Sequence, residues 1–247
     1  MTPIFQIAKD VLLEARRNQI FWLSIVLNIL FFILFTVASS SNEAFQGKIF
    51  LELGFTVLWF LHFCLAIFFS VESLYKDQES KSMYFYLVRN VSRLQYLLGK
   101  YLGFVLSITG SILISGAGFF ACVYKMQGFE VKVMYGLLFL VIEMALTLAI
   151  LMFLAKVFTK IITIFSFLFL FFLSNFIEYI EVVSEFPTLV KSLFLLLPNY
   201  KYFSYIDMIV HAKVMSMEYV YFISVYGLSL SIFYLILSSI QFEKKVL

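Results

Sequence analysis

A single carboxylate deep within an apolar run is the residue of this chain best placed for chemistry. Glu143 lies near the middle of the run from about Val133 to Ala155. An ionisable side chain at the centre of a membrane span costs about 2.5–3.5 kcal/mol on insertion scales, so its presence is a functional hypothesis by default. A place on a substrate path or a subunit seam is one interpretation of Glu143. A protonated or hydrogen-bonded structural group is the other.

Small polar residues recur every four positions in another apolar run, from about residue 101 to 124. Gly103, Ser107, Ser111 and Ser115 thereby share one face of a helix. Membrane helices associate where small residues allow close approach, because lipid tails are as apolar as leucine. This face is predicted to pack on another helix, within the subunit or across a dimer. The alternative is that it forms the polar wall of a substrate path.

The motifs of several enzyme classes are absent from the sequence. There is no G-x-x-x-x-G-K-[ST] phosphate-binding loop, so the chain is not expected to bind ATP in that way. Only His62 and His211 occur, without an H-E-x-x-H motif, which argues against a zinc intramembrane protease or any other metal site. His62 stands alone on an apolar helix, where a role in helix packing is favoured. The sequence predicts no catalytic residues and no cofactor held by this chain.

The composition is that of a membrane protein. Of the 247 residues, 63% are apolar and 13% are charged, whereas about 25% charged residues is usual in soluble domains. The isoelectric point of about 8.7 comes from basic loops and gives no nucleic-acid footprint. Cys64 and Cys122 both fall in apolar runs, so no disulfide framework is predicted.

Six apolar runs are long enough to cross a bilayer. An α-helix of roughly 20 residues spans the hydrocarbon core, which is about 30 Å thick. The runs extend from about Ile20 to Ala38, Ile49 to Val71, Tyr101 to Tyr124, Val133 to Ala155, Ile161 to Ile180 and Tyr219 to Ile240. We therefore predict an all-α polytopic membrane protein in which residues 1–247 form a single transmembrane domain.

Two segments outside these runs are also expected to contact the membrane. Residues 1–19 are amphipathic, with apolar residues at helical spacing and charges between them, which predicts an interfacial helix on the cytoplasmic side. Residues 181–217 are broken by Pro187 and Pro198, and the apolar stretch between these prolines is too short to cross. This second segment is predicted to be re-entrant or interfacial on the outer side.

The distribution of basic residues predicts the orientation. With both termini inside, twelve of the 18 Lys and Arg residues fall in cytoplasmic segments, and the opposite orientation reverses that ratio. Because cytoplasmic loops carry the excess of Lys and Arg, the sequence predicts a multi-pass protein of the cell inner (plasma) membrane with cytoplasmic termini.

The segment 72–100, between the second and third runs, is too charged to lie in hydrocarbon and is predicted to be a cytoplasmic loop. Its middle is more apolar than a linker without a binding role would be. This predicts a short helix on the membrane surface that presents one face to a soluble partner. Asp77 and Glu79 are expected to favour the positive end of that helix. The predicted anchors, aromatic and aliphatic side chains beside two arginines, are Met83, Tyr84, Phe85, Leu87, Val88, Arg89 and Arg93.

The same segment resembles the loop after the second span of ABC-2 type permeases, the membrane subunits of a class of ABC transporters. The matching residues are Asp77 and Glu79, Ser82, Tyr86-Leu87, Val91-Ser92-Arg93 and Gly99-Lys100. Lys81 and Asn90 depart from the usual residues, the second of which is proline. The resemblance extends to an N-terminal elbow helix, six spans, an outer insertion before the last span and a basic tail.

This resemblance implies the function and the partners of the chain. A permease of this kind moves a substrate, here expected to be exported, with ATP and magnesium bound by a separate cytoplasmic ABC ATPase. A second copy of the chain or a related permease completes the transporter in the lipid bilayer. The coupling contact to the ATPase is carried onto Asp77, Glu79, Ser82, Met83, Tyr84, Phe85, Leu87, Val88, Arg89 and Arg93.

Two other classes of function are compatible with parts of the sequence. A membrane anchor or scaffold subunit would need the same cytoplasmic contact without moving a substrate. An ion-coupled secondary transporter usually has several intramembrane ionisable groups, repeated halves and helices broken by Gly or Pro. Glu143 is the one acidic residue deep in a span, and no span contains proline, so this class is less favoured.

Overall fold

The computed structural model of this chain describes residues 3–38, 43–80, 91–127, 131–175, 197–203, 206 and 217–244. These ranges are mostly helical and contain no β-strand. The elements are α1 (Pro3–Arg17), α2 (Gln19–Ala38), α3 (Glu43–Glu79), α5 (Arg93–Gln127), α6 (Val131–Val157), α7 (Lys160–Asn175), the 3-10 helix η2 (Tyr200–Phe203) and α11 (Met217–Lys244).

Five of the described helices are long and apolar enough to cross a membrane. Their spanning segments are Gln19–Val37, Lys48–Glu79, Arg93–Lys125, Val131–Val157 and Met217–Phe242. The predicted fifth span, 161–180, is described only as the 16 residues of α7. At 1.5 Å per residue α7 is about 24 Å long, less than the hydrocarbon core. The structure thus describes a helical multi-pass membrane protein with five candidate spans.

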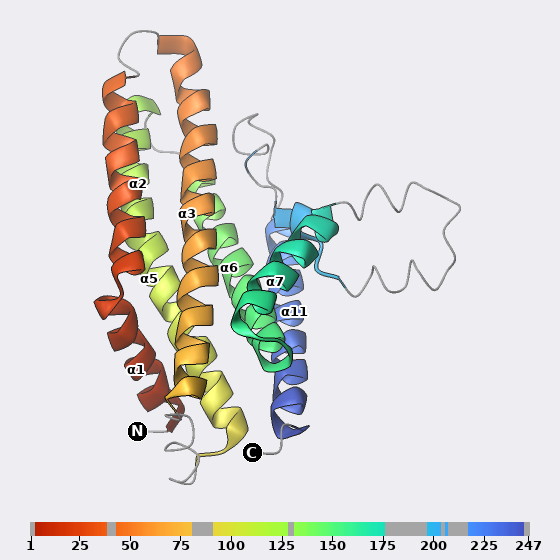
Figure 1. Cartoon of the computed structure of the whole chain (residues 1–247). Helices are drawn as coiled ribbons and strands as arrows, with labels where there is room; N and C mark the ends of the chain where they lie inside the picture. The colour runs from red at the N-terminus through yellow and green to blue at the C-terminus, as the bar shows by residue number, and fades with distance from the viewer. Residues whose placement is uncertain are drawn as a thin grey trace.

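Helix α6 forms the centre of the bundle (Figure 1). It packs against α11, α3, α5 and α7, and its residues from Phe139 to Lys156 are almost all buried. Helices α2 and α11 lie at the periphery, where bulky apolar side chains such as Leu34 and Ile232 are exposed. Apolar surface on this scale marks a membrane-facing protein.

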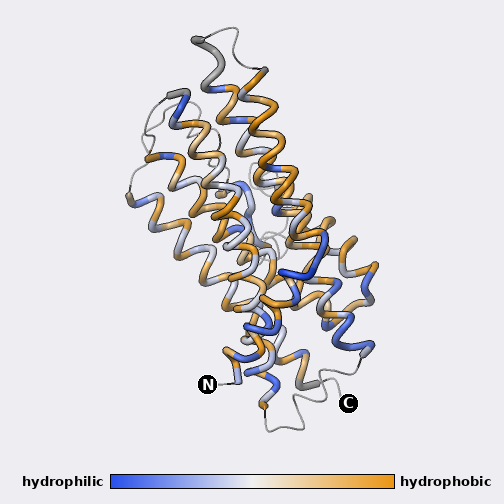
Figure 2. Tube along the Cα trace, turned by 90° about the vertical axis from the view of Figure 1, so that its left-hand side faces the viewer, coloured by the Kyte–Doolittle hydropathy of each residue, from blue (hydrophilic) through white to orange (hydrophobic). Residues whose placement is uncertain are grey.

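Both ends of the chain lie at one end of the bundle (Figure 1), where α3, α6 and α11 end and α5 and α7 begin. Figure 2 shows hydrophilic residues gathering towards this end, with the long helices mostly apolar beyond it. Its described basic residues include Arg17, Lys76, Arg93, Lys100 and Lys156. We call this end of the bundle the basic end.

The helices extend beyond the apolar runs from which they were predicted. Helix α3 continues to Glu79, where the second span was expected to end at Val71, and α5 begins at Arg93 rather than near Tyr101. The first eight and last eight residues of the predicted loop 72–100 are therefore continuations of α3 and α5. Hydropathy marks the thickness of hydrocarbon to be crossed, and a helix can continue into water beyond it.

Helix α1 lies along α5 through an unusually close contact. Ile7, Ala8, Val11 and Ala15 are buried on one face of α1, as its amphipathic spacing requires. A Cβ atom on Gly99 would lie 2.8 Å from Cβ of Ile7, and one on Gly103 would lie 2.6 Å from Cβ of Val11. Only glycine fits at these two positions, because a side chain there would overlap α1.

We expect Gly103→Ala to lower the free energy of unfolding by about 1–3 kcal/mol, since the new methyl group forces α1 away from α5. Gly110→Ala on the same helix is the matched control, because nothing lies within 4 Å of a Cβ added there. The control should be neutral or stabilising by up to about 1 kcal/mol, through better helix propensity. Thermal unfolding in mild detergent measures both, and equal effects would contradict the close contact.

Candidate functional site

A buried ammonium group at the basic end joins three helices. Lys100 of α5 is 5% exposed, and its Nζ lies 2.7 Å from Oδ2 of Asp77 and 3.7 Å from Oε2 of Glu14. Asp77 Oδ2 also accepts a 2.5 Å hydrogen bond from the hydroxyl of Tyr96. Burying an ammonium costs several kcal/mol unless it is paired and hydrogen-bonded. The two carboxylates, one from α1 and one from α3, provide that compensation.

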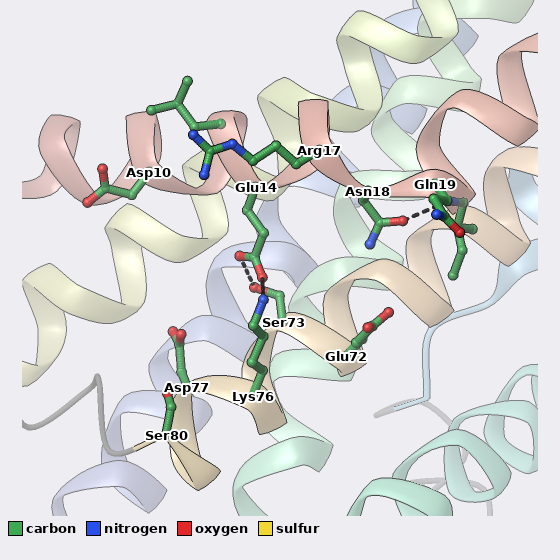
Figure 3. Close-up of a pocket in the computed structure, with 12 residues that line it drawn as sticks. Asp10, Glu14, Arg17, Asn18, Gln19, Glu72, Ser73, Lys76, Asp77 and Ser80 are labelled. Carbon is green, nitrogen blue, oxygen red and sulfur yellow. Dashed lines mark hydrogen bonds and ion pairs between the residues drawn. The ribbon is translucent and has the colours of Figure 1, made fainter.

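Ser73 of α3 completes this network. Its hydroxyl donates to Oε2 of Glu14 at 2.6 Å and accepts from Nζ of Lys100 at 3.2 Å. Figure 3 shows Glu14 reaching from α1 towards Ser73 and Lys76, whose Nζ lies 3.8 Å from Oε1 of Glu14. We call Glu14, Ser73, Asp77, Tyr96 and Lys100 the ionic junction. Sequence reasoning singled out only Asp77 and, through the Gly-Lys motif, Lys100.

The structure places Asp77 and Glu79 at the end of α3. Both lie in the last turn of that helix, at its negative end. Asp77 is largely buried and engaged by Lys100 and Tyr96. Glu79 is exposed to solvent. Of this acidic pair, therefore, only Glu79 presents its side chain to the surroundings.

Helix α5 begins with a reciprocal cap. The backbone N–H of Gln95 donates to Oγ of Ser92 at 3.2 Å, and the backbone N–H of Ser92 donates to Oε1 of Gln95 at 3.0 Å. This arrangement is a capping box, which satisfies two backbone donors at a helix N-terminus. The serine of the Val-Ser-Arg motif therefore has a structural role at the start of α5.

The predicted anchor Arg93 is bonded within the chain. Its Nη1 donates to the backbone carbonyl of Phe242 at 3.0 Å, and its guanidinium lies 5.7 Å from the centroid of the Phe242 ring. The ammonium of Lys156 lies 4.2 Å from the same centroid. Phe242 is buried, so it holds the end of α11 against α5 and α6.

Tyr75 joins α3 to the turn between α6 and α7. Its hydroxyl donates to the carbonyl of Phe158 at 2.6 Å and lies 2.7 Å from Oγ1 of Thr163. The turn is as short as predicted, since α6 ends at Val157 and α7 begins at Lys160. All described helices that begin or end at the basic end are thus connected to α3 or α5.

The remaining predicted coupling residues lie outside the described part of the chain. They are Ser82, Met83, Tyr84, Phe85, Leu87, Val88 and Arg89, within the segment 81–90. The structure describes the residues on either side of this segment, and these include the last turn of α3 and the first turn of α5.

Glu143 lies in the bundle centre, 3% exposed, on the most buried helix. Its Oε1 accepts a 2.7 Å hydrogen bond from the indole N–H of Trp59 on α3. No cationic side chain in the described ranges lies within 4 Å of it. A carboxyl group in that position is held by a neutral donor, in contrast to the paired charges of the ionic junction.

An aromatic cluster from α3, α7 and η2 includes Trp59, the hydrogen-bond partner of Glu143. The Trp59 ring stacks on Phe63 with centroids 4.9 Å apart, and Phe171 of α7 lies 4.8 Å from Phe63 and 5.0 Å from Tyr200 of η2. The hydroxyl of Tyr200 lies 3.1 Å from Oγ1 of Thr147, one turn beyond Glu143 on α6. The cluster therefore joins α3, α6, α7 and η2 around one carboxyl group.

The serine stripe is buried within the chain. Ser107, Ser111 and Ser115 are at most 2% exposed. Ser111 lies 3.2 Å from Nε2 of His62 on α3, and Nδ1 of His62 lies 2.8 Å from the carbonyl of Leu58. His62 therefore packs between α3 and α5, as favoured from the sequence.

No model of a known protein family matches this chain, and no curated protein matches its sequence. The similarity to ABC-2 permeases thus rests on the motifs quoted above. Within the described ranges, no group of three or more His, Cys, Asp or Glu residues is placed to hold a metal ion.

We expect Lys100→Met to lower the free energy of unfolding by about 3 kcal/mol, because it leaves the partly buried carboxylates of Asp77 and Glu14 without their shared cation. Lys160→Met is the matched control at an exposed position, with an expected effect within about 0.5 kcal/mol. Chemical unfolding in mild detergent measures both. Adding Asp77→Leu to Lys100→Met should cost less than the sum of the single changes. Strict additivity would contradict the junction.

For Glu143, we expect Glu143→Gln to be nearly neutral for stability, because an amide oxygen can still accept from Trp59. Glu143→Leu should cost about 1–3 kcal/mol, since it leaves the buried indole N–H unpaired. In a Trp59→Phe background the leucine variant should cost less, which a double-mutant cycle measures. If Glu143→Gln is as damaging as Glu143→Leu, the carboxylate charge itself is required, and the neutral-donor account is wrong.

Proposed function

We propose that this chain is the membrane subunit of an ABC-2 type transporter, exporting a substrate with ATP hydrolysed by a separate cytoplasmic ATPase subunit. In this proposal the basic end faces the cytoplasm, in keeping with the excess of Lys and Arg there. The proposal includes a sixth span that continues α7, and assembly with a second copy or a related permease.

One observation carries the proposal: the two helix ends that border segment 81–90 are connected to every described helix that begins or ends at the basic end. Asp77 is bonded to Lys100 and Tyr96, Tyr75 to the α6–α7 turn, and Arg93 to the end of α11. A permease without its own ATPase receives mechanical work through a cytoplasmic contact. A contact made at segment 81–90 would act on a rigid assembly of helix ends.

The coupling surface of the proposal is assigned to segment 81–90 and to the exposed Glu79. Aromatic and arginine anchors usually carry most of the energy of an interface, and truncation of one commonly costs about 2 kcal/mol or more. Tyr84 and Phe85 are the proposed aromatic anchors. Arg93 is proposed as a positioning residue, since its guanidinium already binds the carbonyl of Phe242.

The test is a pull-down of tagged chain from its native membranes in mild detergent, with the captured proteins identified by mass spectrometry. The wild type should retain a protein with a phosphate-binding loop, and Tyr84→Ala plus Phe85→Ala should release most of it while the chain stays inserted. Loss of two anchors predicts a fall of at least about tenfold in the retained partner.

The matched control is Phe165→Ala plus Phe169→Ala, two exposed phenylalanines on α7 at 68% and 66% exposure. It removes the same apolar groups from a membrane-facing helix and should leave the partner bound. Retention of the partner by the Tyr84/Phe85 variant would reject this coupling surface. Recovery of no ATP-binding protein with the wild type would favour a membrane anchor and reject the transporter.

A further inference from the structure

A polar groove opens beside the ionic junction, between the second half of α1, the bend into α2 and the last turns of α3 (Figure 3). Its volume is about 760 Å³, within the range of small-molecule sites. Asn18 forms the bend and caps α2, since its Oδ1 accepts from the backbone N–H of Ile20 at 2.8 Å. The groove thus lies at the α1–α2 junction.

The groove lies where both helices change from apolar to charged. The apolar span of α2 begins at Gln19, and the charged end of α3 begins at Glu72. Beside it, Trp22 is 48% exposed and its indole N–H donates to the carbonyl of Arg16 at 2.8 Å. Half-exposed tryptophan at such a boundary is typical of the headgroup level of a membrane. The groove therefore lies at the level along the helices that is expected for lipid headgroups.

Two charges of opposite sign line the groove without being used by the fold. Glu14, Ser73, Lys76 and Asp77 contact one another or Lys100. In contrast, Arg17 on the α1 side and Glu72 on the α3 side are exposed and make no hydrogen bond or ion pair with any other described residue. They offer a guanidinium suited to a phosphate and a carboxylate suited to an ammonium.

The net charge of the groove lining determines which class of lipid headgroup the groove favours. The lining includes four carboxylates, those of Asp10, Glu14, Glu72 and Asp77, and two cations, those of Arg17 and Lys76. The ammonium of Lys100 behind the lining pairs with Asp77 and Glu14, which leaves one carboxylate in excess. This excess of negative charge disfavours a headgroup whose net charge is negative. A zwitterion meets both free groups, and a primary ammonium donates hydrogen bonds to a carboxylate, which a quaternary choline cannot. Leu13 and Ile20 supply apolar surface for the glycerol and the first acyl carbons.

We propose that this groove binds the headgroup of a zwitterionic phospholipid with a primary ammonium, of the phosphatidylethanolamine class, its phosphate beside Arg17 and its ammonium beside Glu72. The site is independent of ATP, of any partner subunit and of the substrate of transport. Lipid bound there would make the position of α1, and with it the ionic junction, depend on the lipid composition of the membrane leaflet at the basic end.

The experiment uses the full chain, delipidated in mild detergent and titrated with dioleoyl phosphatidylethanolamine, phosphatidylcholine or phosphatidylglycerol, with bound lipid counted by native mass spectrometry. The ethanolamine lipid should bind about tenfold more tightly than the other two. Glu72→Gln should reduce its affinity to that of the choline lipid. Arg17→Gln should weaken both zwitterionic lipids alike, because it removes the phosphate contact.

The control variants are Arg16→Gln, which changes a neighbouring exposed arginine outside the groove, and Glu52→Gln, near the far end of α3. Both should keep the wild-type preference, and all four variants should unfold at the wild-type temperature. Equal affinity for the three lipids, a preference for phosphatidylglycerol, or an unchanged preference in Glu72→Gln would each overturn the proposal.

Two further arms separate a membrane lipid from other occupants. Soluble glycerophosphoethanolamine should fail to displace the lipid at equal concentration, since it lacks the acyl chains that Leu13 and Ile20 would contact. Displacement at equal concentration would overturn the lipid assignment in favour of a free phosphate-ammonium ligand. A photo-crosslinker at Leu13 should capture lipid in native membranes, and capture of a protein there would overturn the proposal.

Discussion

The placement of one buried ammonium governs how the helices meet at the basic end. Lys100 cannot lie in an apolar bundle alone, because the unpaired charge would cost several kcal/mol. Its two carboxylates come from different helices, Asp77 from α3 and Glu14 from α1. The three helices are therefore fixed together at one level along the bundle, since a shift of one helical turn in any of them would separate the charges by about 5 Å.

The close contact of α1 with the glycines of α5 also sets the position of α1 relative to Lys100. Gly99 and Gly103 allow the α1 backbone to approach until Ile7 and Val11 touch α5. That approach places Glu14, one turn further along α1, at the Lys100 ammonium. Apolar packing and ion pairing thus support one position of α1, and neither alone would fix both its distance and its register. The bend at Asn18 follows, because α2 must leave this position to run along α3 and α5.

Among its six predicted spans, the sequence predicted the five that the structure describes, and it also predicted the amphipathic first helix and the short α6–α7 turn, because each depends on local hydropathy or spacing. The sequence did not predict the surroundings of residues whose positions depend on tertiary packing. The sequence assigns no role to Glu14, and only the packing of α1 on α5 brings it to Ser73 and Lys100. The sequence predicts Asp77 at a surface contact, because the length of α3 beyond its apolar run is not visible in hydropathy.

Some of the motif residues that resemble those of ABC-2 permeases have a structural role in this chain. Ser92 caps α5, Gly99 admits α1, and Lys100 holds the ionic junction, so these motif residues have physical roles that require no partner. A recurring pattern of this kind would be kept by any function that needs the same helix ends joined. Under the proposed function, the contact with a partner is assigned instead to Glu79, exposed at the end of α3, and to segment 81–90, which lies outside the described residues.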